Sequence, residues 1–223
     1  MLRLDAGNTA SNPGTGTTWA DLSGNGNNGT LNGGVSYSGT NGGVLSFDGV
    51  SGYVSLPNDI VTTSNIRANG ITYSAWVKSS NTATEQRIIG QKPSGGYSDF
   101  ASGGLGISGN KAKMIAYDDN ISYKSAIGNT TLQNNTWYFI AGTYDMSDKN
   151  IRIFVNGRLD GTPIAITTFN RLIANTENFI GTLYTTSTYS FNGAISSVGI
   201  YNKVLSADEI MQNFNALRGR YGI

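Results

Sequence analysis

The segment from Phe191 to Gly219, FNGAISSVGIYNKVLSADEIMQNFNALRG, most constrains the fold, because it joins an alternating strand to a fully capped helix. Ser206 is a good N-cap, and Glu209 three residues later can complete a capping box. Apolar residues then recur at helical spacing, namely Ile210, Phe214 and Leu217. We therefore predict a helix that packs one face on a sheet and ends at Gly219, which can adopt the left-handed backbone of a helix stop.

The rest of the chain is typical of an all-β protein. Its 30 Gly, abundant Asn, Ser and Thr, and only 13% charged residues suit short strands joined by tight turns. We expect strands near 44–48, 52–56, 71–78, 86–91, 104–108, 111–117, 136–145, 150–156, 163–168, 178–183 and 191–201. This regular spacing predicts a sandwich of two antiparallel sheets with a short C-terminal helix.

Two shorter stretches give local predictions. In 71–78 (ITYSAWVK) side chains alternate between two faces, and the apolar face formed by Ile71, Tyr73, Ala75 and Val77 is the better candidate for the core. Trp76 lies on the opposite face but is still expected to be buried, because large aromatic residues mostly are. Asn156 and Gly157 favour the positive φ angles of a tight hairpin turn.

The opening stretch, residues 7–43, is rich in Gly and Asn. We predict that it forms an ordered but irregular wrap across the sandwich, with Trp19, Leu22 and Leu31 as its anchors. Trp137, further along the chain, is predicted to be a core residue.

The length and composition favour one domain over residues 1–223. A chain of 223 residues fits a single sandwich, since these commonly reach ~200–250 residues. The four Pro lie far apart, so no Pro-rich linker divides the chain. The absence of Cys excludes disulfides, thiolate metal sites and thiol nucleophiles, and it leaves the redox compartment open.

Charge and hydropathy argue against two classes of partner. Lys and Arg number 15, Asp and Glu number 14, and the basic residues are scattered, so no surface for nucleic acid is predicted. No apolar run approaches the ~18 residues of a membrane span, so no membrane insertion is expected, and the N-terminus resembles no secretory signal. Either export is not signal-directed or the chain was excised from a longer one.

The closing segment resembles the C-terminal signature of the laminin-G-like, concanavalin A-like jelly rolls, in which a strand reading F-x-G-x-I-x-x-V-x-I-Y leads into N-x-x-L-S-x-x-E-I. Other stretches agree with that family in the expected order: WADLSGNGNNGTL (19–31), VLSFDG (44–49) with YV (53–54), and WY (137–138) followed by GTYD (142–145) and VNG (155–157). The resemblance spans nearly the whole chain and implies an all-β jelly-roll sandwich of the concanavalin A type.

The two ends of the chain resemble copies of this domain in structural proteins of tailed bacteriophages. These ends are the opening LRLDAGN…GTTWADLSGNGNNGTL and the close EIMQNFNALRGRYGI. The similarity implies a location on the virion surface, with other virion proteins or a host-surface glycan as partners. A homo-oligomer would suit attachment, because copies on a fibre multiply a weak sugar affinity.

The residues argue against catalysis. The absence of His removes serine-type triads and His-ligated metals. Glycosidases of this fold carry a Glu-x-Asp-x-(x)-Glu motif on one strand, but Glu85, Glu177 and Glu209 have no Asp two residues on. A glycan-degrading enzyme would need the fold to bring together distant carboxylates, for instance Asp118 and Asp145.

Calcium is the one cofactor that the resemblance implies, because many laminin-G-like domains hold one ion at the sandwich rim. Asp48, in the sequence Phe47-Asp48-Gly49, is the matching residue. Related domains often have a second acid where this chain reads ISSV (195–198), so that carboxylate is missing here. In the alternative interpretation, the Asp48 carboxylate accepts hydrogen bonds from its own turn.

Sugar recognition uses aromatic rings and planar polar side chains on loops. Several tyrosines and acids lie near predicted loops or strand ends and are the candidate carbohydrate-binding residues: Tyr97, Tyr117, Asp118, Asp119, Tyr123, Tyr184 and Tyr189. The leading hypothesis is a non-enzymatic jelly-roll module on a phage particle that binds a host-surface carbohydrate or aids attachment. The alternative is a capsid decoration or cement protein with a purely structural role.

Overall fold

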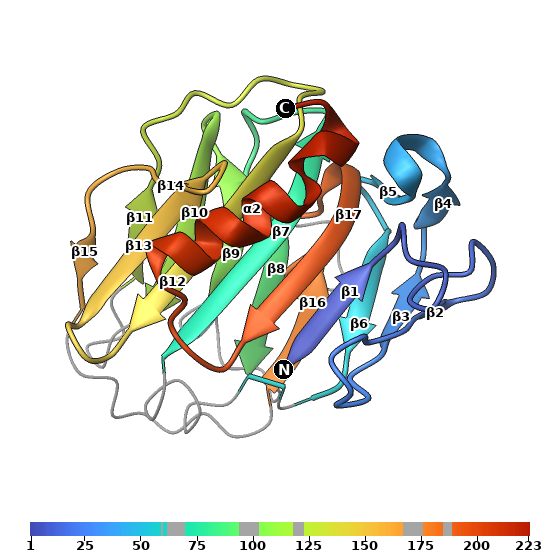
Figure 1. Ribbon diagram of the computed structural model, residues 1–223, viewed down its shortest axis with the longest axis horizontal. Coiled ribbons are helices and arrows are strands. Elements are labelled where there is room, and N and C mark those ends of the chain that lie inside the picture. The colour runs from blue at the N-terminus through green and yellow to red at the C-terminus, as the bar shows by residue number, and fades with distance from the viewer. Residues whose placement is uncertain (59, 62–69, 94–102, 118–122, 167–175, 185–188) are drawn as a thin grey trace.

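The computed structural model describes residues 1–58, 60–61, 70–93, 103–117, 123–166, 176–184 and 189–223. Within these residues, two antiparallel sheets pack face to face, and one α-helix crosses the outer face of one of them (Figure 1). This arrangement confirms the predicted jelly-roll sandwich with a C-terminal helix.

The first sheet has nine strands, in the order β14 (Arg158–Leu159), β13 (Asn150–Val155), β12 (Tyr138–Asp145), β7 (Ile71–Ser79), β17 (Asn192–Tyr201), β5 (Val44–Asp48) and β4 (Ser36–Ser38), with β1 (Leu2–Asp5) beside β17 and β15 (Ile164–Ala165) beside β13. The second has eight, in the order β11 (Tyr123–Ile127), β10 (Lys111–Tyr117), β9 (Gly104–Ser108), β8 (Gln86–Pro93), β16 (Thr176–Ile180), β6 (Tyr53–Leu56), β3 (Gly29–Asn32) and β2 (Thr18–Trp19).

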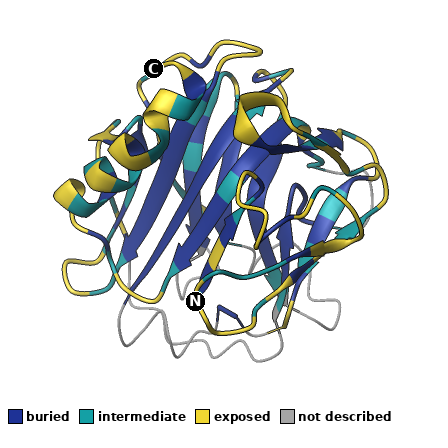
Figure 2. Ribbon diagram, turned by 45° about the vertical axis from the view of Figure 1, so that its right-hand side comes forward, coloured by how far each residue is buried: buried dark blue, intermediate teal, exposed yellow. Residues whose placement is uncertain are grey.

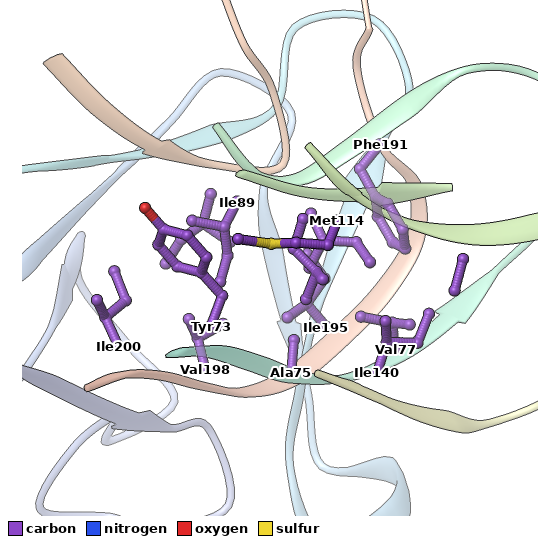
Figure 3. Packing of buried hydrophobic residues seen from close by; sticks show 14 of the residues in the cluster. Tyr73, Ala75, Val77, Ile89, Met114, Ile140, Phe191, Ile195, Val198 and Ile200 are labelled. Atoms are coloured by element: carbon purple, nitrogen blue, oxygen red, sulfur yellow. The ribbon is translucent and has the colours of Figure 1, made fainter. Parts of the chain in front are cut away.

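The main core lies between the two sheets (Figure 3). β7 contributes Tyr73, Ala75 and Val77, which face residues of the opposite sheet such as Ile89 and Met114. All five are at most 2% exposed. Burying one large aliphatic side chain contributes roughly 1.5–3 kcal/mol, so the alternation fixes which face of β7 points inward. The predicted core face of 71–78 is confirmed.

The opposite face of β7 is buried too, because α2 (Ala207–Tyr221) covers it and exposes only its own outer side (Figure 2). Trp76 is fully buried, and its ring stacks on Tyr221 and Phe214 of the helix at centroid distances of 4.2 and 5.6 Å. Trp137 joins this second core with its ring 4.6 Å from that of Tyr221. The predicted burial of both tryptophans is confirmed, and β7 has two buried faces.

The start of α2 was predicted correctly and its end was not. The Ser206 hydroxyl accepts from the Glu209 N–H at 3.2 Å, and the Ser206 N–H donates to the Glu209 carboxylate at 2.9 Å, so the capping box is complete. The helix runs through Gly219 and stops at Gly222, which has φ 73°. Stacking of Tyr221 on the second core outweighs the poor helix propensity of Gly219, which is roughly 1 kcal/mol worse than Ala.

A bulge in β17 at Ser196 anchors the end of the helix. β5 pairs with β17 before the bulge and β1 pairs with it after the bulge. The Arg220 guanidinium donates to the Ser196 hydroxyl and the Asp5 carboxylate, both at 2.7 Å, and to the carbonyls of Gly43 at 2.5 Å and Asn41 at 2.6 Å. This Arg220 clasp therefore joins the helix, β1, β17 and the segment before β5.

The opening stretch is ordered, as predicted, but is more regular than expected. It contains β2, β3, β4 and the 3-10 helix η1 (Thr40–Gly42). Trp19 is fully buried, Leu31 packs against the main core and Leu22 is half-buried, so all three predicted anchors contribute.

The predicted hairpin between β13 and β14 is confirmed. Asn156 and Gly157 have φ angles of 49° and 80°, and Val155 pairs with Arg158. A Cβ at position 157 would lie 2.9 Å from the sulfur of Met211 in α2, so glycine also permits close packing of the helix. Among the described residues, no helix is long and apolar enough to cross a membrane.

Candidate functional site

The candidate site lies on the outer face of the eight-stranded sheet, around β8 and β9. Leu105 and Ile107 of β9 point into the main core, so Gly106 between them faces outward. Arg87 of β8 is the ladder partner of Gly106, and Gly90 is the partner of Gly104. The middle of this face therefore has three glycines and one arginine, and the missing side chains leave room for other segments to approach.

The segment after β16 crosses this face over Gly90. A Cβ at position 90 would lie 2.3 Å from the Thr182 carbonyl oxygen and 3.0 Å from the Leu183 Cα, so only glycine allows the crossing. The Thr182 hydroxyl donates to the Tyr184 carbonyl at 2.5 Å, which fixes the chain just beyond. This crossing carries Tyr184 and Tyr189 onto the outer face.

Tyr184 and Tyr189 form an aromatic–cationic cluster with Arg87 and Lys92. The two rings lie 6.2 Å apart at an interplanar angle of 37°. The Arg87 guanidinium carbon is 4.9 Å from the Tyr189 ring centroid, and the Lys92 ammonium is 5.8 Å from that of Tyr184. A cation within ~6 Å of the centre of an aromatic ring makes a favourable cation–π interaction, so each tyrosine ring has one such partner. Both tyrosines remain partly exposed to solvent.

Tyr189 has an unusual backbone conformation for a bulky residue, with φ 64°. Its carbonyl accepts the Arg87 N–H at 2.9 Å, which ties the segment to β8. Residues held in this region cost of order 1–3 kcal/mol and often occur at functional sites. The hydrogen bond to the Arg87 N–H and the Arg87 guanidinium beside the ring both favour this position of Tyr189.

Arg87 is a buried charge, with only 4% of the residue exposed. Glu85 neutralises it through an ion pair of 2.7 Å. A Cβ at Gly106 would come within 3.6 Å of the Arg87 Cδ, so the arginine side chain lies along the glycine. Nε of Arg87 has no hydrogen-bond partner among the described residues. Buried polar groups normally have a partner, so this N–H is an exception within the described part of the chain.

Tyr123 stands at the edge of the same face and is 45% exposed. Burial of part of the ring raises the pKa of its hydroxyl above the usual 10.0, and Arg87 opposes this while Glu85 and Tyr189 add to it. A hydrogen bond with Ser125 also lowers the pKa, but burial prevails, so the hydroxyl is protonated at neutral pH. These charge effects place Tyr123 within electrostatic range of the aromatic–cationic cluster.

The structure thus brings together three of the predicted carbohydrate-binding residues. Tyr117 ends β10 and pairs with Tyr123 in the ladder, but its side chain is not described. Tyr97, Asp118 and Asp119 lie outside the described residues. The sequence analysis missed the charged members of the site, Glu85, Arg87, Lys92 and Glu177. Charged residues flanking and interrupting an apolar strand at 86–91 were the available signal.

The carboxylates offer no paired acids among the described glutamates. Glu85 bonds to Arg87, Glu177 bonds to Lys92 at 2.9 Å, and Glu209 bonds to Lys203 at 2.5 Å. Asp145 lies 3.7 Å from the Arg152 guanidinium, and its suggested partner Asp118 is outside the described residues. Each of these four carboxylates therefore has a cationic neighbour.

The Asp48 carboxylate accepts hydrogen bonds from the turn that follows it. It accepts the N–H groups of Val50, Ser51 and Gly52 at 2.8–2.9 Å and the Ser51 hydroxyl at 2.7 Å. Burial raises the pKa of Asp48, but these hydrogen bonds outweigh it and hold the pKa well below 3.8. N–H donors repel a cation, and no cluster of three acidic residues occurs in the described part of the chain. The surroundings therefore do not fit a calcium ion. The geometry matches the alternative interpretation, in which the Asp48 carboxylate accepts hydrogen bonds from its own turn.

The fold and its outer face define a jelly-roll sandwich with a polar, aromatic surface. The chain matches a laminin G family model, described as the concanavalin A-like lectin/glucanases superfamily, over residues 48–211. The chain belongs to this superfamily, as its sequence resemblance predicted. A comparison with curated protein sequences finds no match.

Solved structures with the same fold include binding domains of botulinum neurotoxins and of a paraclostridial mosquitocidal protein. The botulinum neurotoxin serotype G binding domain superposes with TM-score 0.71 at 19% identity, over 96% of this chain and 50% of that one. The binding domain of Paraclostridial Mosquitocidal Protein 1 gives TM-score 0.73 at 15% identity, over 96% and 51%. The botulinum serotype D binding domain gives 0.70 at 17%, over 97% and 51%. The chain thus spans about half of each neighbour, and the likeness establishes the fold.

Proposed function

We propose that this protein is a non-enzymatic carbohydrate-binding module on a phage particle, and that the aromatic–cationic cluster contacts a host-surface glycan. The observation that carries the proposal is the placement of Tyr184 and Tyr189 on the outer sheet face, each held by a cation. Aromatic rings pack against the C–H faces of sugars, and nearby charged groups bind hydroxyls. Tyr123 adds a partly exposed phenol at the edge of the site.

The structural neighbours support a binding role. They are receptor-binding or binding domains, and the part that superposes on this chain is about half of each. The ion pairs of Glu85 and Glu177 support a role without catalysis. A glycosidase needs one carboxyl group that donates a proton and a second, free carboxylate beside it. The phage location rests on the resemblance of the two chain ends to phage structural proteins.

The binding proposal is tested on a glycan array, with the protein displayed in several copies to offset weak single-site affinity. The best glycan is then titrated by calorimetry against wild type and Tyr189→Ala. We expect about a tenfold loss, equivalent to ~1.4 kcal/mol, because the substitution removes one ring of the pair. Tyr37→Ala is the matched control, since Tyr37 is 39% exposed on β4 of the other sheet.

Equal affinities for wild type and Tyr189→Ala, with unchanged circular dichroism, would reject this face as the site. Mass spectrometry of the glycan after incubation tests the non-enzymatic part, and a cleaved product would overturn it.

The location is tested separately by immunogold electron microscopy on intact particles of the phage that encodes the chain. Label at fibres or tail supports attachment. Label spread over the head favours the alternative of a capsid decoration protein, and particles without label contradict both.

A further inference from the structure

A groove of about 370 Å³ lies on the outer face of the nine-stranded sheet, between α2 and the strands β17 and β1. The aromatic–cationic cluster is on the outer face of the other sheet, so the main core separates the two. Small-molecule sites in proteins occupy ~300–1,000 Å³, which makes this groove suitable for a small ligand.

The floor of the groove is a row of three residues across neighbouring strands. Arg3 of β1 pairs with Gly199 of β17, which pairs with Ser74 of β7. The glycine leaves a gap between the Arg3 and Ser74 side chains. A Cβ there would lie 2.8 Å from the Ser74 hydroxyl and 2.9 Å from the Tyr201 ring, so the ring closes one end of the gap.

The wall of the groove is the edge of α2. Asn213 donates its side-chain amide to the Tyr201 hydroxyl at 3.2 Å, and Ala216 and Leu217 provide apolar surface beside it. The groove therefore offers hydroxyl and amide groups next to an apolar wall. This combination matches a sugar ring, which has both C–H faces and hydroxyls.

Trp76 gives an independent indication of a ligand. The residue lines the groove and is fully buried, yet its indole Nε1–H has no hydrogen-bond partner among the described residues. An unpaired buried donor costs ~1–3 kcal/mol. A ligand oxygen that reached the indole N–H from the groove would remove that cost.

The charges at the groove favour an anionic ligand. Asp5 is the acidic residue of the lining, and Arg220 neutralises it at 2.7 Å. Arg3 is exposed, and within the described part of the chain only its backbone N–H makes a hydrogen bond, so its guanidinium has no partner there. A guanidinium binds a carboxylate through two parallel hydrogen bonds, which is a strong and specific contact.

We infer that this groove is a second binding site, and that it takes a single sugar ring bearing a carboxylate, of the hexuronate class. The carboxylate bonds to Arg3, and the hydroxyls bond to Ser74, Asn213 and the indole N–H of Trp76. The apolar wall at Leu217 covers one face of the ring. The inference does not depend on the proposed function, because it uses a different face and different residues.

The test is an NMR titration of the ¹⁵N-labelled full chain with glucuronate, glucose and acetate. The readouts are the Trp76 indole N–H, assigned with Trp76→Phe, and the Asn213 side-chain amide. We expect saturable shifts of both signals with glucuronate, and about tenfold weaker binding of glucose. Acetate supplies only the charge, so it should be weaker as well. Arg3→Gln should reduce glucuronate affinity about tenfold, to the level of glucose.

The matched control is Arg218→Gln, which removes an exposed charge from α2 outside the groove. Ala216→Trp fills the groove from the exposed side of the helix and should abolish the shifts without affecting the fold. Absence of saturable shifts overturns the inference. The inference is also overturned if glucose or acetate binds as tightly as glucuronate. The same holds if Arg218→Gln lowers glucuronate affinity as much as Arg3→Gln does. Tyr189→Ala should leave these shifts unchanged, which separates this site from the proposed glycan site.

Discussion

Replacing Arg220 by Ala should destabilise the protein substantially, because one side chain joins four separate parts of the fold. The substitution removes its four hydrogen bonds, to Asn41, Asp5, Gly43 and Ser196. Breaking a fully buried ion pair costs ~3–5 kcal/mol, but the side chains of Arg220 and Asp5 keep 16% and 13% of their exposure, so solvent offsets part of the loss. The Gly7 N–H also still bonds to the carboxylate, at 2.9 Å.

We therefore expect Arg220→Ala to lower the free energy of unfolding by ~2–3 kcal/mol, which for a chain of this size lowers Tm by about 5–10 °C. The measurement is equilibrium urea unfolding followed by tryptophan fluorescence, with an unchanged m-value as the sign of a simple stability change. Arg220→Lys keeps the charge but cannot reach four acceptors with one ammonium, so it should recover only part of the loss.

Two results would refute this reasoning. One is a change below ~0.5 kcal/mol in Arg220→Ala, which is the range of ordinary surface substitutions. The other is full recovery in Arg220→Lys, which would show that charge alone matters and that the fork geometry does not.

Four further predictions concern other parts of the fold. Ser206→Ala should cost ~1 kcal/mol in urea unfolding through loss of the helix cap, and a change below ~0.3 kcal/mol would contradict the capping box. Trp76→Ala should cost ~3–5 kcal/mol because it leaves a cavity beneath α2, and a smaller loss would mean that the helix contributes little to the core. The lowered pKa of Asp48 means that its carboxylate stabilises the fold above its ordinary pKa of 3.8 and loses this effect as pH falls toward the folded pKa. Asp48→Asn should therefore flatten the decline of unfolding free energy between about pH 4 and pH 2, and an equal decline in both proteins would argue against this linkage. Gly90→Ala should displace the segment at Thr182 and reduce glycan affinity, measured by calorimetry, so a variant with unchanged affinity would show that the crossing does not position the tyrosines.

The parts of the fold that the sequence predicted correctly depend on neighbouring residues. The capping box needs only Ser206 and Glu209, and the hairpin turn needs only Asn156 and Gly157. The inward and outward faces of β7 can be assigned from the alternation of side chains in its own nine residues. In each case the physical cause acts within a few positions along the chain.

The failures have non-local causes. The helix passes Gly219 because Tyr221 stacks on Trp76, which is 145 positions away in the sequence. β1 was missed because its four residues are ordered only by pairing with β17 at the other end of the chain. The aromatic–cationic cluster forms only because one segment crosses β8, and a loop's path over a sheet cannot be read from the loop's own residues.

Outward-facing glycines nevertheless carry a usable signal for such sites. Glycine within a strand usually marks a close approach by another group, and on the inward face that group belongs to the core, as Met114 does at Gly142. On the outward face the approaching group belongs to a segment that crosses the surface. Gly90 lies beneath Thr182, Gly106 lies beside Arg87, and Gly199 lies beneath Tyr201. Once alternation assigns a strand's inward face, its outward glycines therefore indicate where the outer surface is covered or hollowed, and both candidate sites here lie at such positions.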